Sequence, residues 1–234
     1  MSSIILNGDT SGSVTLQSPS VAGTTVVTLP NASGTIMAPA TAGTSGQFLT
    51  SSAGGAPTWT TPSAGAMTLI STITGDNTSG TIAWTGLSGY GSFLVVFNSL
   101  ISSGNIYVYM NVGYGSTPTY VTTGYKYQIM DLTGGTLNTG TYPTNATSWQ
   151  TAYNAIGTSQ PGLSGQALIT NPTTSTLAAT LTSSFVFQTA GGSNYNTAIT
   201  NGYVTLTSPV TAVKLTTSSG NFVTGAVSLY GISS

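Results

Sequence analysis

The sequence predicts an all-β protein, and three observations carry that prediction. Apolar β-branched and aromatic residues occur in short runs that alternate with polar residues, and Gly, Pro and Asn interrupt these runs at regular spacing. No stretch keeps a convincing helical period. The 12 Tyr, 6 Phe and 3 Trp supply side chains for a core, so we expect a folded chain although only 2% of its residues are charged.

The N-terminal part, residues 1–37, contains very short apolar runs between turn residues. One copy has too little apolar surface for a core of its own, so we expect other copies of the chain or a docking partner to stabilise it. It is therefore predicted to be a short-stranded segment for association with other copies or for attachment to a partner; that the association is trimerising is what the resemblance given below implies. Its candidate contact residues are Ile5, Leu6, Val14, Leu16, Val26, Leu29 and Ile36.

Residues 38–66 are rich in Ala, Gly, Ser, Thr and Pro and predict a linker. Phe48, Leu49 and Trp59 are the sizeable side chains in it, and we expect them to act as anchors.

Residues 67–234 predict a C-terminal β-sandwich of jelly-roll type, because they hold about nine or ten candidate strands between Gly and Pro turns. Ile106, Val108, Met110 and Val112 are expected on one face of a strand, and Trp84 and Phe93 in the core. Residues 148–156 are the best helical candidate, with one or two turns. The other candidate strands are 67–73, 93–97, 120–130, 166–170, 177–187, 203–206, 211–215 and 224–232.

The composition excludes most enzyme chemistry. The chain has no His and no Cys, and its 3 acidic residues are all Asp, so a Ser-His-Asp triad, a thiolate zinc site and a paired-Glu glycosidase cannot be built. We expect no enzyme, cofactor or metal. A net charge of −1 with 2 Lys and no Arg argues against nucleic acid. No apolar run is long enough for a membrane span, and the N-terminus has no signal-peptide pattern.

Asp9, Asp76 and Asp131 each stand beside Gly, Asn or Thr. One interpretation is a calcium site made from an Asp and carbonyl oxygens. The favoured interpretation is that each carboxylate caps a turn by accepting backbone N–H bonds, because no Asp-rich cluster exists.

Lys126 and Lys214 lie in strand-like sequence. Each lysine is expected to point to solvent on an edge strand, where its charge discourages pairing of that strand with another chain. The alternative is that the ammonium stacks on an aromatic ring or touches an anionic glycan. Because both lysines are in expected strands, the folded protein should resist trypsin.

The stretch 132–165 carries three large rings, those of Tyr142, Trp149 and Tyr153, without a clear strand pattern. These rings are candidate receptor contacts, forming an aromatic platform for a sugar beside Asn138, Asn145, Gln150 and Asn154. The favoured alternative is that the rings cover the core of their own loop.

Two groups of motifs stand out along the chain. The first comprises Leu6–Leu16, Pro19, Val21–Gly23, Thr28–Pro30 and Ser33–Thr35, followed by Gly46–Ser51 and Ala56–Trp59. The second comprises Gly86–Ser88, Phe93–Phe97, Gly220–Phe222, Gly225 and Leu229–Ile232. The first group resembles the N-terminal repeat and linker of tailed-bacteriophage fibre and virion-appendage proteins. The second is similar to the small β-sandwich that ends many such appendages.

The resemblance implies a homotrimer of the virion that is made in the host cytoplasm and has no enzymatic site. It implies a short tail fibre that contacts other virion proteins through its N-terminus and faces a host surface glycan with its C-terminal sandwich. Two alternatives stay open. One is a capsid decoration or head-fibre protein, and the other is a monomeric carbohydrate-binding module or bacterial surface adhesin.

Overall fold

The computed structural model describes residues 3–7, 9–17, 43–52, 55–61, 67–140, 143–159, 161–171, 178–190 and 195–233. Within these residues every regular element is a β-strand, which confirms the all-β prediction. The chain divides into two compact units, Met1–Ser63 and Ala64–Ser234.

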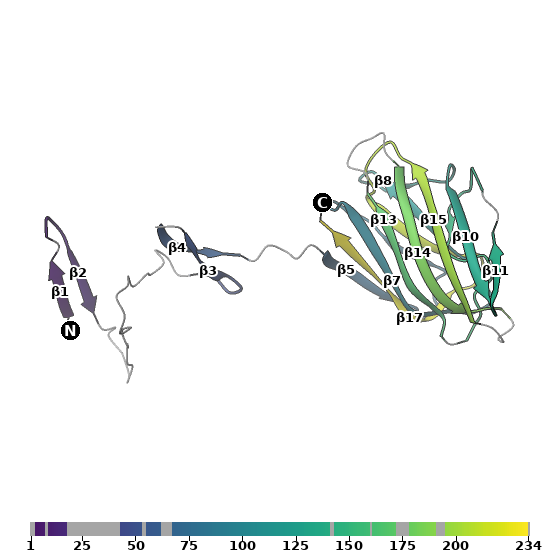
Figure 1. Ribbon diagram of the computed structural model, residues 1–234, viewed down its shortest axis with the longest axis horizontal. Coiled ribbons are helices and arrows are strands. Elements are labelled where there is room, and N and C mark those ends of the chain that lie inside the picture. Colours follow the sequence, from purple (N-terminus) through teal and green to yellow (C-terminus); the bar gives the residue numbers. More distant parts are fainter. Residues whose placement is uncertain are drawn as a thin grey trace. The chain divides into compact units, whose positions relative to one another are not determined.

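The described part of the first unit consists of two antiparallel hairpins (Figure 1). β1 (Ser3–Asn7) pairs with β2 (Ser13–Gln17), which confirms the first two short strands of the sequence. β3 (Phe48–Ser52) pairs with β4 (Gly55–Thr60) and places Leu49 opposite Trp59. The linker prediction for residues 38–66 did not include this second hairpin.

The second unit contains two antiparallel sheets. The larger has eight strands in the order β11-β10-β15-β14-β13-β7-β17-β5, and Figure 1 shows it as one broad layer. The smaller has five, in the order β12-β8-β16-β6 with β9 added beside β8. Their bounds are β5 Met67–Thr74, β6 Thr81–Trp84, β7 Ser92–Ser102, β8 Val108–Tyr114, β9 Thr119–Tyr120, β10 Lys126–Thr133, β11 Thr136–Thr139, β12 Trp149–Gln150, β13 Leu163–Thr170, β14 Ala178–Gln188, β15 Tyr195–Thr205, β16 Ala212–Thr217 and β17 Phe222–Ile232.

The buried faces of both sheets meet in one hydrophobic core, as the two layers of a β-sandwich do. Strand periodicity explains which residues enter it. In β14, Leu181 and Phe185 are buried while Thr182 and Ser184 between them are exposed. Trp84 and Phe93 are core residues, as the sequence predicts. The jelly-roll connectivity stays a prediction.

A β-bulge allows β17 to follow β7. Gly225 has a φ of 86°, and a Cβ at this position would collide with the backbone of Ser99 and Leu100. The register between the two strands shifts on both sides of Thr224. Glycine adopts a positive φ at a bulge without steric penalty, so this position requires glycine.

Most expected strands are present, but several differ in extent. Ile106, Val108, Met110 and Val112 are all buried on one face, as predicted. The helix expected in 148–156 is wrong, because the segment instead pairs as β12 and makes a β-bridge at Ile156. The expected strand 120–130 begins only at Lys126, and the expected strand 203–206 begins eight residues earlier, at Tyr195.

Candidate functional site

Trp149 lies in the core rather than on the surface. β12 pairs with β8, and the Trp149 side chain is 0% exposed. Its ring meets the buried Tyr125 ring edge-on, with 4.9 Å between centroids. Gly202 leaves room for the indole, since a Cβ there would lie 3.0 Å from its nitrogen. The candidate receptor contact is therefore wrong for Trp149. The favoured alternative is correct that the ring is buried, but the ring packs in the core of the sandwich rather than in a core of its own loop.

Tyr125 is held in this part of the core by a hydrogen bond to the backbone of β8. Its hydroxyl accepts a hydrogen bond from the Val112 backbone N–H at 3.0 Å. Burial raises the pKa of Tyr125 to about 12. The phenol is thus a neutral structural group at any ordinary pH.

Tyr153 is 42% exposed, whereas Tyr142 lies outside the described residues. The amides expected to bind sugar hydroxyls are engaged with the protein. Asn154 donates to Asp131, Asn138 donates to Thr133, Gln150 donates to the Ala152 carbonyl, and Asn145 accepts from the Gly124 N–H. The described residues therefore do not form a platform of three exposed rings.

Asp131 does not cap a surface turn, which corrects the prediction for this residue. It lies inside β10 and is 0% exposed. Its Oδ2 accepts hydrogen bonds from the Asn154 backbone N–H at 2.8 Å and side-chain amide at 3.3 Å, while Oδ1 has no partner. Burial raises the pKa of this carboxyl above its ordinary value, against those hydrogen bonds.

Asn196 lies near Asp131 on the buried side of the sheet. Its opposite residue on β10 is Thr133, and Asp131 is opposite Ala198, so Asn196 and Asp131 are diagonal neighbours. Asn196 is 1% exposed, and neither atom of its side-chain amide has a hydrogen-bond partner in the described structure. This end of the sheet therefore contains several unsatisfied polar atoms, each of which costs stability.

Asp76 behaves as the turn interpretation predicts. Its Oδ1 accepts the Thr78 hydroxyl at 2.6 Å and the Thr78 backbone N–H at 2.9 Å. These bonds, the hydroxyl first, hold the pKa of Asp76 below its ordinary value. The described residues contain no group of three or more His, Cys, Asp or Glu that could hold a metal ion.

Both lysines lie over tyrosine rings. The Lys126 Nζ is 5.3 Å from the centroid of Tyr203, and the Lys214 Nζ is 4.2 Å from that of Tyr120. The stacking alternative therefore describes both side chains. The edge-strand prediction is wrong for Lys214, because β16 lies between β8 and β6. Lys126 is exposed, beyond the part of β10 that pairs with β11.

The outward side of β15 carries larger apolar side chains than its buried side. Tyr195, Ile199 and Tyr203 are 67%, 38% and 41% exposed, whereas Asn196, Ala198 and Thr200 are buried. This inverts the usual pattern, in which the apolar side of a strand packs on the core. We name this outward side the β15 face, consisting of Tyr195, Thr197, Ile199, Asn201 and Tyr203.

Hydrogen-bonding side chains from neighbouring strands flank the β15 face. Asn201 lies between Gln128 of β10 and Thr182 of β14. Tyr203 lies between Lys126 and Thr180 in the same way. The sequence reasoning missed this face because its strand began only at Tyr203. Tyr195, Ile199 and Tyr203 lie four residues apart, which was the signal that could have found it.

The first hairpin exposes apolar side chains on both of its sides. Ile4, Ile5 and Leu6 are 63%, 60% and 57% exposed, and successive residues of a strand point in opposite directions. Of the other candidate contacts, Val14 and Leu16 lie on β2. Val26, Leu29 and Ile36 lie outside the described residues.

A comparison with known protein families, curated proteins and solved structures finds no match to this chain. The part of the chain that the structure describes holds no helix able to cross a membrane. The function is therefore inferred from the sequence motifs and from the surfaces described above.

Proposed function

We propose that the protein is a structural component of a bacteriophage virion. In this proposal it is a short trimeric tail fibre that attaches to the particle by its N-terminal segment and presents its β-sandwich to the host. The observation that carries the proposal is the first hairpin, which exposes Ile4, Ile5 and Leu6 on both sides. A two-stranded hairpin of this kind is marginally stable alone, so its apolar side chains need a further surface. The likeness of the surrounding motifs to phage fibre proteins favours two further copies of the chain as that surface.

In this proposal apolar contact holds the trimer together. Each of these large side chains contributes about 1.5–3 kcal/mol when it is fully buried. Charge contributes little, since the chain has 2 Lys and 3 Asp. Association should therefore depend only weakly on salt.

We assign host recognition to the β15 face. The exposed parts of the Tyr195 and Tyr203 rings offer apolar surface for the C–H side of a sugar. The Asn201 amide and the Thr182 and Thr197 hydroxyls can donate to and accept from sugar hydroxyls. The inverted pattern of β15 supports this assignment, because Tyr195, Ile199 and Tyr203 lie outside the hydrophobic core.

The test of the virion role has two parts. The purified chain of 23.5 kDa should have a solution mass of about 70 kDa by light scattering, as three copies require. Cryo-electron microscopy of intact particles should then place it on the tail in multiples of three. Density spread over the capsid would show that the protein is a capsid decoration protein rather than a tail fibre. A monomer that binds glycan and is absent from particles would be a free carbohydrate-binding module.

The host-recognition surface is tested with two tyrosines of equal exposure. Tyr203→Ala removes a ring of the β15 face that is 41% exposed, and Tyr153→Ala removes a ring that is 42% exposed in the loop that first suggested a receptor site. We expect Tyr203→Ala alone to reduce adsorption to host cells, by about tenfold or more, with the trimer mass unchanged. Loss of adsorption only in Tyr153→Ala would move the receptor site to the loop. A change of trimer mass in Tyr203→Ala would make the β15 face an interface between copies.

A further inference from the structure

Lys126 borders the β15 face and lies over one of its rings. It is directly opposite Tyr203 in the register of β10 and β15, and its Nζ is 5.3 Å from the centroid of that ring. Both side chains are exposed. The ammonium therefore lies beside the β15 face rather than beyond the free edge of β10, where a ligand bound to this face can reach it.

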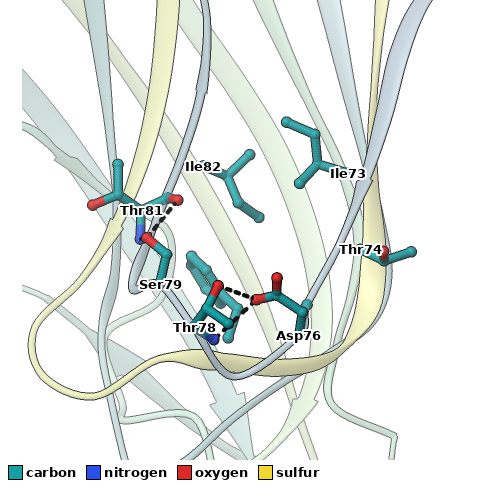
Figure 2. Close-up of a pocket in the computed structure, with 9 residues that line it drawn as sticks. Ile73, Thr74, Asp76, Thr78, Ser79, Thr81 and Ile82 are labelled. Carbon is teal, nitrogen blue, oxygen red and sulfur yellow. Dashed lines mark hydrogen bonds between the residues drawn. The ribbon is translucent and has the colours of Figure 1, made fainter.

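Neither of the two carboxylate side chains in Ala64–Ser234 neutralises this ammonium. Asp131 is buried on the other side of the sheet, five residues further along β10, which is about 17 Å in a strand. Asp76 lies in the turn after β5, where its carboxylate accepts two hydrogen bonds from Thr78 (Figure 2). Five strands separate β5 from β10, a distance of roughly 25–30 Å across the sheet. Exposed charges further apart than about 10 Å are largely screened at 0.1 M salt.

Uncharged hydrogen-bonding side chains lie next to the ammonium. Tyr203 lies between Lys126 and Thr180, and the next outward residue of β15, Asn201, has Thr182 beside it on β14. Outward residues of one strand are about 7 Å apart, so one sugar or a disaccharide can contact the ammonium, the Tyr203 ring and the Asn201 amide together. The ring and the amide suit any sugar, whereas the ammonium suits one with a negative charge.

We propose that the β15 face binds an acidic saccharide whose anionic group, a carboxylate or a phosphate, pairs with Lys126. This inference rests on the assignment of host recognition to the β15 face and names the class of glycan. The lysine ammonium is a compact charge with three donors, so it can pair with either anionic group. A neutral sugar makes the same contacts with the ring and the amide but gains nothing from the charge. Lys126 therefore discriminates between acidic and neutral glycans.

Lys214 provides a matched control for the charge. Its Nζ also lies over a tyrosine, 4.2 Å from the centroid of Tyr120, but its strand β16 belongs to the smaller sheet. Lys126→Gln and Lys214→Gln each change the formal net charge from −1 to −2. A difference between these two variants therefore reports where the charge lies rather than the net charge of the chain.

Three sugars that differ only at C6 test the proposal on the full chain. They are methyl β-D-glucoside, its 6-phosphate, and methyl β-D-glucuronide, which carries a carboxylate. Binding is followed by NMR of the Tyr203 ring, whose signal is identified by its loss in Tyr203→Ala. We expect at least one anionic probe to bind about two- to fivefold more tightly than the neutral one, as an exposed ion pair allows. The tighter of the two anionic probes identifies the anionic group.

The preference for the anionic probe should disappear in Lys126→Gln and persist in Lys214→Gln. It should also disappear in the unchanged protein at about 1 M salt, where the Debye length is about 3 Å. Equal binding of the three probes to the unchanged protein, or no shift of the Tyr203 signal with any of them, would overturn the proposal. Equal loss of the preference in both lysine variants would overturn the role of Lys126.

Host-cell adsorption separates this inference from the assignment on which it rests. If Tyr203→Ala lowers adsorption while Lys126→Gln adsorbs as well as Lys214→Gln, the β15 face recognises the host but its glycan is not acidic. If the anionic probe binds through Lys126 while Tyr203→Ala adsorbs normally, the acidic-sugar site stands and the host-recognition role of the face fails. We expect Lys126→Gln to adsorb about two- to fivefold less well than Lys214→Gln at low salt.

Discussion

The two units are both built from antiparallel strands, but they obtain stability in different ways. In the sandwich, alternating residues send one side of each strand into a shared core, as Phe93 and Val95 do in β7. In the first hairpin Ile4, Ile5 and Leu6 are all exposed, because two strands alone form no second layer. The difference indicates that the sandwich has a core of its own, whereas we expect the first hairpin to need contacts with further copies of the chain.

The largest effect is expected at the trimer contacts that we propose for the first hairpin. Ile4→Ser with Leu6→Ser removes two apolar side chains from one side of β1. Loss of about 3–6 kcal/mol of burial per chain should weaken trimer association by more than a hundredfold. Analytical ultracentrifugation measures the association, and Thr10→Ala in the neighbouring turn is the control. A trimer of unchanged stability would show that β1 is not part of the interface.

A substitution in the core should lower the stability of the sandwich and leave the association of the first hairpin unchanged. Trp149→Ala removes a fully buried ring and leaves a cavity beside Tyr125, so the free energy of unfolding of the sandwich should fall by about 3–5 kcal/mol. Tyr153→Ala should change it by less than about 1 kcal/mol, since that ring is 42% exposed. Chemical denaturation followed by tyrosine and tryptophan fluorescence provides both values. Similar losses in the two variants would contradict the core position of Trp149.

Two glycines with nearly the same φ, one in each unit, allow the effect of an added Cβ on the stability of the two units to be compared. Gly225→Ala places a Cβ against the β7 backbone at a φ of 86° and should destabilise the sandwich by about 2 kcal/mol or more. Gly12 has a φ of 80°, but nothing lies within 4 Å of the added Cβ. Gly12→Ala should therefore cost about 1–2 kcal/mol of local strain in the first hairpin and leave the melting temperature of the sandwich unchanged. Equal effects on the sandwich would contradict the separation into two units.

The buried Asp131 predicts how sandwich stability depends on pH. Burial raises its pKa in the folded state above the ordinary value of an aspartate, so its contribution to stability is fully present below the unfolded pKa. That contribution is lost as pH rises through the folded pKa, because the unfolded chain then ionises more readily. Asp131→Asn removes this loss and should raise the free energy of unfolding at pH 7 by about 1 kcal/mol, with a flat profile above pH 4. A variant less stable than the original at pH 7 would show that the ionised carboxylate is favourable.

Sequence periodicity predicted most of the sandwich, and its failures have physical causes. Runs such as Phe93–Phe97 were found because the core selects large apolar residues at alternate positions. β15 was found only in part, because its buried residues Asn196, Ala198 and Thr200 are small or polar. Trp149 stayed a candidate receptor contact beside the favoured buried interpretation, because β12 is only two residues long and the burial of its ring depends on contacts with Tyr125 and Gly202. Local sequence does not encode contacts of that kind.

Proteolysis should have the smallest effect on the intact sandwich. Trypsin has two sites, after Lys126 in β10 and after Lys214 in β16, and a strand must leave its sheet before a protease can bind it. We expect no cleavage at either lysine under native conditions, as judged on a gel, because opening of these strands requires disruption of the shared core.

Chymotrypsin provides the matching test of the first unit, where Phe48 and Leu49 are 47% and 44% exposed in a two-stranded hairpin. It should cut the monomeric Ile4→Ser, Leu6→Ser variant near these residues and release an intact sandwich, since only the sandwich has a core of its own. Trypsin cleavage at Lys214 before any cut in the first unit would reverse this order of stabilities.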